Sequence, residues 1–289
     1  MRILVTGGSG FIGKHLSKKL LELGHEVYIT GLEKANCPKV AEKFTGLNLS
    51  EIDAIIHLAA ITDTTNYNEK EVEEVNFHQP VQLFNQAIES GIKKLVYASS
   101  CAVYGRSSVP FYEDSGFNPM TPYARSKTDL DIKATELSLK YPDVSIIGLR
   151  YTNVYGCGEE NKDNAASMVY QLFHQAKKGH VKLFKHGEQL RDWVFILDAV
   201  KANLLALDYP KSGVFNIGSG VAISFNHLVN IFEFFLKKKI EVEYIDNPYP
   251  YQDYTLANLD KSKKELGYDP AWSILSGTKI CLKTNFQMI

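Results

Sequence analysis

Three side chains in this sequence have the types and the spacing needed to move a proton on and off an alcohol oxygen. Tyr123 and Lys127 lie four residues apart, and Ser100 precedes them. Residues i and i+4 of a helix share one face, so we expect the Lys127 ammonium beside the Tyr123 phenol. A free phenol has a pKa of about 10, and a neighbouring cation lowers it by favouring the phenolate. The trio therefore predicts a tyrosine acid/base, with Ser100 hydrogen-bonded to the same substrate oxygen.

The same spacing has an ordinary explanation as well. A Tyr-x-x-x-Lys pair on an exposed helix face arises often by chance, and such pairs contribute only a few tenths of a kcal/mol. The functional interpretation therefore depends on the motifs that accompany the pair.

A glycine-rich turn near the start of the chain predicts a dinucleotide site. Gly7, Gly10 and Gly13 are spaced three apart, between an apolar strand at 2–6 and a helix expected at 11–23. Glycine permits the tight turn and the close approach of a pyrophosphate, and the helix N-terminus supplies amide N–H groups. We therefore expect NAD or NADP to bind here, one per subunit. The alternative is a glycine-rich turn that binds no ligand.

The sequence leaves the choice between the two cofactors open. NAD is usually held by a carboxylate that follows the second strand and binds the ribose hydroxyls. Here that strand ends at Thr30 and Gly31 without an acidic residue. Glu33 can take the place of the missing carboxylate, whereas Lys34 can bind the extra phosphate of NADP. We expect NADP slightly more than NAD.

Composition and charge narrow the class of protein. The chain has 289 residues, 45% of them hydrophobic and 22% charged, and a formal net charge of −1, so no overall field attracts nucleic acid or an anionic membrane. The four cysteines are scattered without a Cys-x-x-Cys pair, and we expect no metal site and no disulfide framework. No signal peptide precedes the first strand, and no apolar run reaches the roughly 18 residues of a membrane span. We expect a soluble, cytoplasmic protein.

The order of the predicted elements indicates an α/β protein with a doubly wound parallel sheet. Apolar strands alternate with long helices in the first half, as strands at 2–6, 26–30, 53–58, 94–99 and 145–150 and helices at 11–23, 71–90 and 122–140. We expect residues 1–155 to form the cofactor-binding domain, with the run 191–217 returning to it. Residues 156–190 and 218–289 are expected to form a smaller, mixed domain that binds the substrate.

Five motifs together resemble the extended short-chain dehydrogenases/reductases that act on nucleotide sugars. In chain order they are Gly7-x-x-Gly10-x-x-Gly13, His57-Leu58-Ala59-Ala60, Ser99-Ser100-Cys101-Ala102-Val103-Tyr104-Gly105, Tyr123-x-x-x-Lys127 and Arg150-Tyr151-Thr152-Asn153-Val154-Tyr155-Gly156. The resemblance continues through Arg191-Asp192-Trp193-Val194 and covers nearly the whole chain. It implies a Rossmann domain and a nicotinamide cofactor.

The resemblance also implies a role for each matching residue. Tyr123 would be the acid/base, Ser100 would bind the reacting oxygen, and Lys127 would lower the pKa of Tyr123 and bind the nicotinamide ribose. The cofactor contacts would be Gly7, Gly10, Phe11, Ile12, Gly13, Glu33, Lys34, Leu58, Ala59, Ala60, Asn76, Tyr123, Lys127 and Tyr151. The nucleotide-sugar contacts would be Thr62, Ser100, Asn153, Arg191 and Tyr254. The helices at 71–90 and 122–140 often pair into dimers in this family, so a homodimer is expected.

Two sequence details narrow the reaction. Sugar dehydratases of this family carry Asp-Glu just after the serine, where this chain has Cys101-Ala102, so dehydration is not expected. The loop around Lys162 is similar to that of ADP-L-glycero-D-manno-heptose 6-epimerases, whose loop lysine is a second acid/base. Inversion by transient oxidation to a ketone needs such a group when the oxygen moves between two faces. The alternative for Lys162 is an exposed loop lysine.

Other functions stay open at this point. A UDP-hexose 4-epimerase is the second hypothesis, and a nucleotide-keto-sugar reductase is the third. A cofactor-binding sensor or scaffold without chemistry is the hypothesis from another class, because fold does not dictate function. The intact set of Ser100, Tyr123 and Lys127 favours an enzyme. Thr62, like Thr64 and Thr65, is either a sugar contact or an ordinary loop-capping residue.

Overall fold

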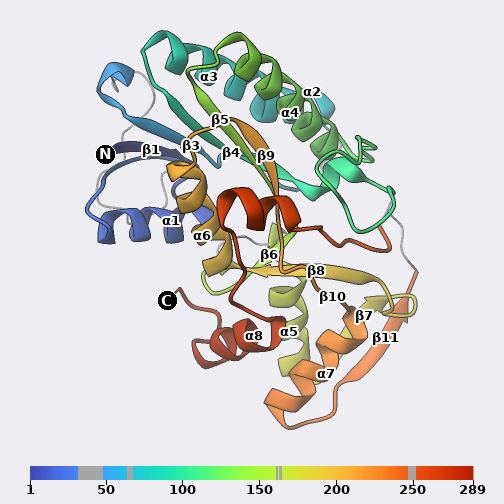
Figure 1. The fold of residues 1–289 in the computed structure, drawn as a ribbon. Coiled ribbons are helices and arrows are strands. Elements are labelled where there is room, and N and C mark those ends of the chain that lie inside the picture. The colour runs from blue at the N-terminus through green and yellow to red at the C-terminus, as the bar shows by residue number, and fades with distance from the viewer. Residues whose placement is uncertain (32–47, 64–67, 161, 163–164, 247–251, 289) are drawn as a thin grey trace.

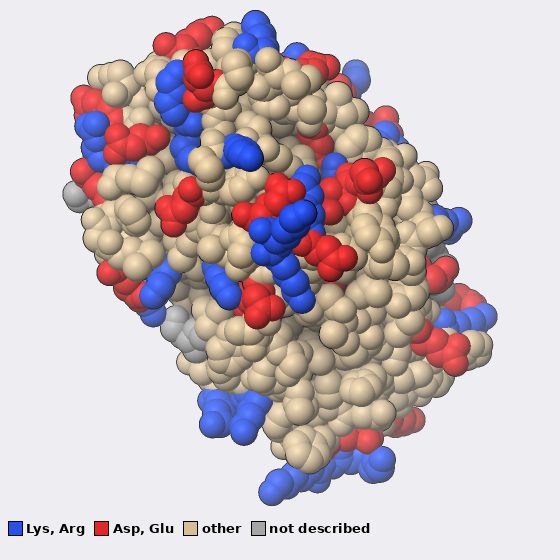
Figure 2. Space-filling view, viewed as in Figure 1, with Lys and Arg blue, Asp and Glu red and all other residues tan. Residues whose placement is uncertain are grey.

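The structure is a computed structural model that describes residues 1–31, 48–63, 68–160, 162, 165–246 and 252–288. Glu33, Lys34, Thr64 and Thr65 lie outside the described residues. Among the described residues, no helix is both long and apolar enough to cross a bilayer. Acidic and basic side chains are interspersed over the face shown in Figure 2, as expected for a net charge of −1.

A six-stranded parallel sheet forms the centre of the larger part of the molecule (Figure 1). Its order is β2 (Glu26–Thr30), β1 (Arg2–Thr6), β3 (Ala54–His57), β4 (Lys94–Ser100), β5 (Ser145–Tyr151) and β9 (Gly213–Ile217). Every residue of β3 and β5 is buried, which explains their continuous apolar sequence. The predicted α/β fold with a doubly wound parallel sheet is confirmed.

Helices cover both faces of this sheet (Figure 1). On one face lie α1 (Phe11–Glu22) and α6 (Ile196–Asp208), which pack on the sheet through one apolar core. On the other face lie α3 (Gln79–Glu89) and α4 (Pro122–Lys140), which share a second core with the sheet. Two short segments, α2 (Glu69–Glu73) and η3 (Glu74–His78), lead directly into α3.

The sequence around residue 121 explains where α4 begins. The Thr121 hydroxyl accepts a hydrogen bond from the backbone N–H of Ala124, and Pro122 occupies the first helical position. A threonine cap satisfies an otherwise unpaired N–H, and proline is tolerated there because its missing N–H would have had no partner. This start fixes the helical register that places Tyr123 and Lys127 in the first turns of α4.

The smaller part contains two further sheets and a third apolar core. One sheet has the order β10 (Ala222–Ser224), β8 (Leu190–Phe195) and β6 (Asn153–Tyr155), and the other pairs β11 (Glu241–Ile245) with β7 (His180–Phe184). Around them lie α5 (Met168–Lys178), α7 (Phe225–Leu236) and α8 (Ile274–Lys283), together with a core rich in aromatic side chains. Short helical turns lie at η2 (Leu49–Glu51), η4 (Cys101–Tyr104) and η6 (Ser262–Leu266).

The run 191–217 is divided between these two parts. Its last strand, β9, pairs with β5 in the central sheet. Its first strand, β8, pairs instead with β6 and β10. The return to the central sheet is therefore made by β9 alone, because β6 leaves that sheet directly after β5 and takes β8 as its partner. The assignment of two domains by residue range stays a prediction.

A buried polar network joins α4 to β4, β5 and β9. Asp131 on α4 accepts hydrogen bonds from the Tyr97 hydroxyl at 2.9 Å and from Nε of Arg150 at 2.7 Å. Arg150 also donates to the Tyr104 hydroxyl at 2.7 Å, which in turn donates to Asn216 at 2.7 Å. The side chains of Asp131 and Arg150 are only 1% and 4% exposed, so each charge depends on the other for compensation.

We predict that Asp131→Asn destabilises the protein by about 3 kcal/mol or more, because it leaves the Arg150 charge buried without its carboxylate. The matched control is Glu136→Gln on the same helix, which breaks an exposed pair with Lys133 and should cost under about 0.5 kcal/mol. Urea unfolding followed by circular dichroism measures both changes. Equal effects of the two substitutions would contradict the importance given to the buried network.

Candidate active site

The glycine turn packs directly against the loop that follows β3. Gly7 has φ +67°, and a Cβ placed on it would lie 2.7 Å from the backbone nitrogen of Ala59. A Cβ on Gly13 would lie 2.2 Å from the Gly7 carbonyl oxygen. Gly10 caps α1 without any side-chain hydrogen bond, and the first turn of α1 has no acidic residue. The turn thus combines close backbone approach with a free, positively polarised helix end, which fits a pyrophosphate.

Ser100, Tyr123 and Lys127 come together at the carboxyl end of β4. Ser100 is the last residue of β4, and its hydroxyl accepts a hydrogen bond from the Ala102 N–H at 3.1 Å. The Tyr123 phenol lies close enough to the Ser100 hydroxyl for that hydroxyl to lower its pKa. Nζ of Lys127 lies 5.9 Å from the centre of the Tyr123 ring and donates to the Ala98 carbonyl at 2.9 Å. The three groups that the sequence singled out therefore form one cluster.

Burial controls the charges in this cluster. It lowers the pKa of Lys127 to about 8, although the carboxylate of Asp131 acts in the opposite direction. It also raises the pKa of Tyr123, and the hydrogen bond with Ser100 only partly offsets this rise. The sequence predicted a Tyr123 pKa lowered by Lys127, whereas in the structure burial raises this pKa and the group that lowers it is the Ser100 hydroxyl. Tyr123 is therefore a protonated phenol in this state, ready to donate a proton.

His57 lies buried beside this cluster. Its Nδ1 is 2.7 Å from the Thr6 hydroxyl, and its Nε2 has no hydrogen-bond partner among the described residues. Burial lowers the pKa of His57 to about 3, and the positive charge of Lys127 acts in the same direction. His57 is thus a neutral imidazole at physiological pH. Cys101 is also buried, which raises the pKa of its thiol well above the usual range and disfavours a nucleophilic role.

Several of the predicted cofactor contacts already have partners in the structure. Asn76 is fully buried; it accepts a hydrogen bond from the Ile61 N–H at 2.8 Å and donates to the Ser126 hydroxyl at 3.2 Å. It therefore ties the loop after β3 to α4, next to Lys127. The phenol of Tyr151 faces the other side of the sheet and accepts from Asn203 at 2.7 Å. Their contacts with a cofactor stay predictions.

Three of the predicted substrate contacts gather in the smaller part. Asn153 donates to the Asp192 carbonyl at 3.1 Å, and Arg191 donates to the carbonyls of Leu190 and Gln252. Tyr254 is 38% exposed and forms a β-bridge with Leu190. These residues share the edge formed by β6, β8 and the segment 252–257. Of the two remaining predicted contacts, Ser100 belongs to the cluster described above, and Thr62 is exposed in the loop after β3.

Lys162 lies against the cofactor turn. Its Nζ is 4.8 Å from the centre of the ring of Phe11, the first residue of α1, and 3.5 Å from Oε2 of Glu159. Lys162 therefore lies beside the first residue of α1, and α1 and the Tyr123-bearing α4 cover opposite faces of the central sheet. Glu159 and Asp131 were not among the residues expected from the sequence. The i,i+3 spacing of Glu159 to Lys162 and the i,i+4 spacing of Lys127 to Asp131 were available signals.

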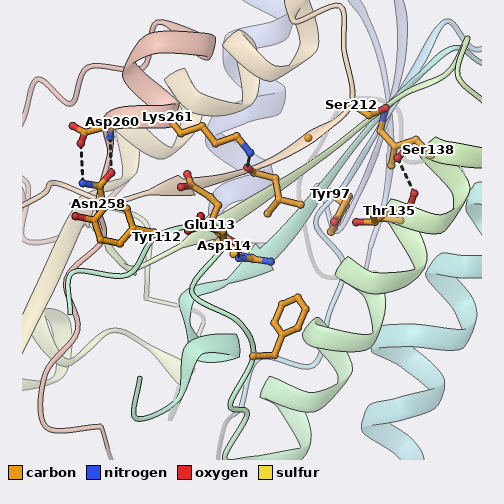
Figure 3. Close-up of a pocket in the computed structure, with 16 residues that line it drawn as sticks. Tyr97, Tyr112, Glu113, Asp114, Thr135, Ser138, Ser212, Asn258, Asp260 and Lys261 are labelled. Carbon is orange, nitrogen blue, oxygen red and sulfur yellow. Dashed lines mark hydrogen bonds between the residues drawn. The ribbon is translucent and has the colours of Figure 1, made fainter. Parts of the chain in front are cut away.

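A hollow of about 690 Å³ lies away from this cluster, between α4, the edge strand β9 and the segment 258–261 (Figure 3). Tyr97 and Arg150 of the buried network line it, together with Lys261, which donates to the Val214 carbonyl at 2.9 Å. None of Ser100, Tyr123 and Lys162 lines it. The hollow is therefore a feature of the sheet edge and separate from the candidate active site.

The model of the NAD dependent epimerase/dehydratase family matches residues 3–218. The chain belongs to this family. It is 33% identical over 306 aligned residues to an ADP-L-glycero-D-manno-heptose-6-epimerase of Brachyspira hyodysenteriae, covering 96% of this chain and 95% of the relative. Membership of the NAD(P)-dependent epimerase/dehydratase family, which the sequence motifs indicated, is confirmed.

Two solved structures are similar over nearly the whole chain. The ADP-L-glycero-D-manno-heptose-6-epimerase of Helicobacter pylori superposes with a TM-score of 0.87 at 32% identity, covering 98% of this chain and 95% of its own. The UDP-glucose 4-epimerase of Thermotoga maritima, solved with UDP-glucose, gives a TM-score of 0.88 at 26% identity and covers 98% of each chain. The backbone alone thus fits both kinds of epimerase, and the sequence is more similar to the heptose epimerases.

The geometry of the turn predicts that Gly7→Ala weakens cofactor binding at least tenfold, because the new methyl group would collide with the backbone at Ala59. Gly24→Ala is the matched control, since Gly24 has φ +82° but no atom within 4 Å of the position that a methyl group would take. Gly24→Ala should cost roughly 1 kcal/mol of stability through backbone strain, and Gly7→Ala should cost more, because its methyl group also meets the Ala59 backbone. Titration of protein fluorescence with NADH and NADPH measures affinity, and unchanged affinity in Gly7→Ala would contradict this site.

The depressed pKa of His57 predicts a pH dependence of stability. The folded protein binds no proton at His57 above about pH 3, whereas the unfolded chain binds one below about pH 6.5, so stability falls as the pH drops between these values. Between pH 7 and pH 5 the loss from this residue should be about 2 kcal/mol. Urea unfolding of wild type and His57→Gln at both pH values tests this. An identical pH dependence in the two proteins would show that His57 is not the cause.

Proposed function

We propose that the protein is an NAD(P)-dependent nucleotide-sugar epimerase that inverts C6 of an ADP-heptose. The observation that carries the proposal is the placement of the two proposed acid/base residues beside helices that cover opposite faces of the sheet. Tyr123 reaches the carboxyl end of β4 from the α4 side, and Lys162 lies on the α1 side against Phe11. The 33% identity to a heptose epimerase supports the choice of sugar.

The bound nicotinamide would supply reversible hydride acceptance at the carbinol carbon. The residues of the chain would do the rest. For the oxidation, Tyr123 would act in its phenolate form and take the proton of the reacting hydroxyl group, while Ser100 keeps that oxygen in place. Lys127 would hold the cofactor ribose and stabilise the phenolate form of Tyr123. After the flat ketone turns in the site and hydride returns to its other face, Lys162 would give a proton to the oxygen. Tyr123 would then release its proton to solvent, and Lys162 would regain one from solvent.

The nucleotide sugar would lie across the edge formed by β6, β8 and the segment 252–257. The planar guanidinium of Arg191 suits the diphosphate, because its fork donates parallel hydrogen bonds. Asn153 and Tyr254 would bind the remainder of the nucleotide, and Thr62 a sugar hydroxyl. A homodimer through α3 and α4 and a cytoplasmic location remain predictions. The exposed Ile132 and Leu139 on α4 support the first of these.

Tyr123→Phe should lower kcat by about a thousandfold or more, since general acid/base groups contribute roughly 10²–10⁴-fold. The cofactor should still bind within about twofold of wild type, because the substitution removes one hydroxyl. Tyr112→Phe, a change at an exposed tyrosine of the separate hollow, is the control. Turnover within tenfold of wild type, about 1.4 kcal/mol of barrier, would show that Tyr123 is not the acid/base.

Lys162→Met distinguishes the proposed reaction from inversion by a UDP-hexose 4-epimerase. A 6-epimerase that needs a second acid should lose at least a hundredfold in kcat. A 4-epimerase that works through one tyrosine should keep its activity. Lys182→Met, which removes an exposed lysine paired with Glu243, controls for a general effect of losing a lysine. Full activity of Lys162→Met would remove this residue from the mechanism.

A further inference from the structure

Residues before and after Lys162 donate hydrogen bonds to one buried carboxylate, that of Glu159. The side chain of Glu159 is fully buried. Its Oε1 accepts hydrogen bonds from the Gly156 N–H at 3.0 Å and the Ser167 hydroxyl at 2.7 Å, and its Oε2 accepts from the Ser167 N–H at 2.6 Å. Glu159 therefore joins the two ends of the loop, at the end of β6 and at the start of α5.

The three shorter hydrogen bonds to Glu159 come from the neutral Gly156 and Ser167, and they do not compensate its negative charge. Buried carboxylates are normally paired with a cation. Among the described residues, Lys162 is the one cation within ion-pair distance of Glu159, with Nζ 3.5 Å from Oε2. The Lys162 side chain is 25% exposed, so its ammonium has one partner inside the protein and one side open.

The ammonium group of Lys162 also contacts an aromatic ring. Its Nζ lies 4.8 Å from the centre of the Phe11 ring, within the range of a cation–π contact. Phe11 is the first residue of α1 and directly follows Gly10 of the cofactor turn. The carboxylate of Glu159 and the face of Phe11 thus hold the ammonium beside the dinucleotide site.

We propose that Glu159 is a positioning residue for Lys162, which fixes the loop and holds the ammonium on the side of the cofactor turn opposite Tyr123. Glu159 itself touches neither substrate nor cofactor in this proposal. The inference rests on the proposed function of Lys162 as the second acid. It gives Glu159 a role in the mechanism in addition to its structural role of joining Gly156 and Ser167.

A double-mutant cycle separates positioning from a purely structural role, because residues that act through one another give non-additive effects. The variants are Glu159→Gln, Lys162→Met and the double substitution, each assayed for inversion of the ADP-heptose. In the wild-type background, Glu159→Gln should lower kcat at least tenfold and change KM less than threefold. In the Lys162→Met background, it should change the residual kcat less than twofold. Glu243→Gln, which frees the exposed Lys182, should change nothing.

Each outcome decides the inference. An equal loss of kcat from Glu159→Gln in both backgrounds would mean that Glu159 acts on the fold and not through Lys162, leaving the proposed function intact. No loss in the wild-type background would also overturn the inference. Full activity of Lys162→Met would remove the second acid itself, and the inference with it. If circular dichroism shows that Glu159→Gln does not fold, Glu159→Asp replaces it in the same cycle, because the shorter side chain withdraws the charge from Lys162.

Discussion

The rest of the site depends on the contacts that hold the buried ammonium of Lys127. Lys127 is only 1% exposed, and a cation this deep in a protein needs partners. The Ala98 carbonyl accepts from it directly, and the negative charge of Asp131, one turn further along α4, favours its charged form. Asp131 is in turn held by Arg150 on β5. The position of α4 is therefore tied to β4 and β5 by a chain of interactions that begins at Lys127.

The loop after β3 is tied into the same arrangement. Asn76 joins the backbone of Ile61 to Ser126, the neighbour of Lys127 on α4. The glycine turn also packs against Ala59 of that loop. Displacement of α4 would thus disturb both Tyr123, the proposed acid/base, and the glycine turn that we propose binds the dinucleotide. This coupling explains why buried polar groups lie here, where apolar contacts would be easier to bury.

Some of these features could be predicted from the sequence and others could not. The predicted helix 122–140 is confirmed as α4, and Thr121 and Pro122 are strong local signals for its start. The sheet to which β8 belongs could not be predicted from the sequence, because an apolar strand pattern does not indicate which strand will be its partner. The direction of the Tyr123 pKa shift also differed, since burial depends on side chains from distant segments. Asn76 illustrates the same limit: a polar residue in a helix gives no sign that it braces a loop fifteen residues away in sequence.

In the proposed mechanism, two acid/base groups on opposite faces of one site, Tyr123 and Lys162, invert a single sugar carbon. Proton NMR of the purified protein, loaded with NADP or NAD and mixed separately with ADP-L-glycero-D-manno-heptose and UDP-glucose, tests this mechanism most directly. We expect the ADP-heptose to convert to a mixture of its two C6 epimers, while UDP-glucose stays unchanged. Inversion of C4 in UDP-glucose with the ADP-heptose left intact would contradict the mechanism.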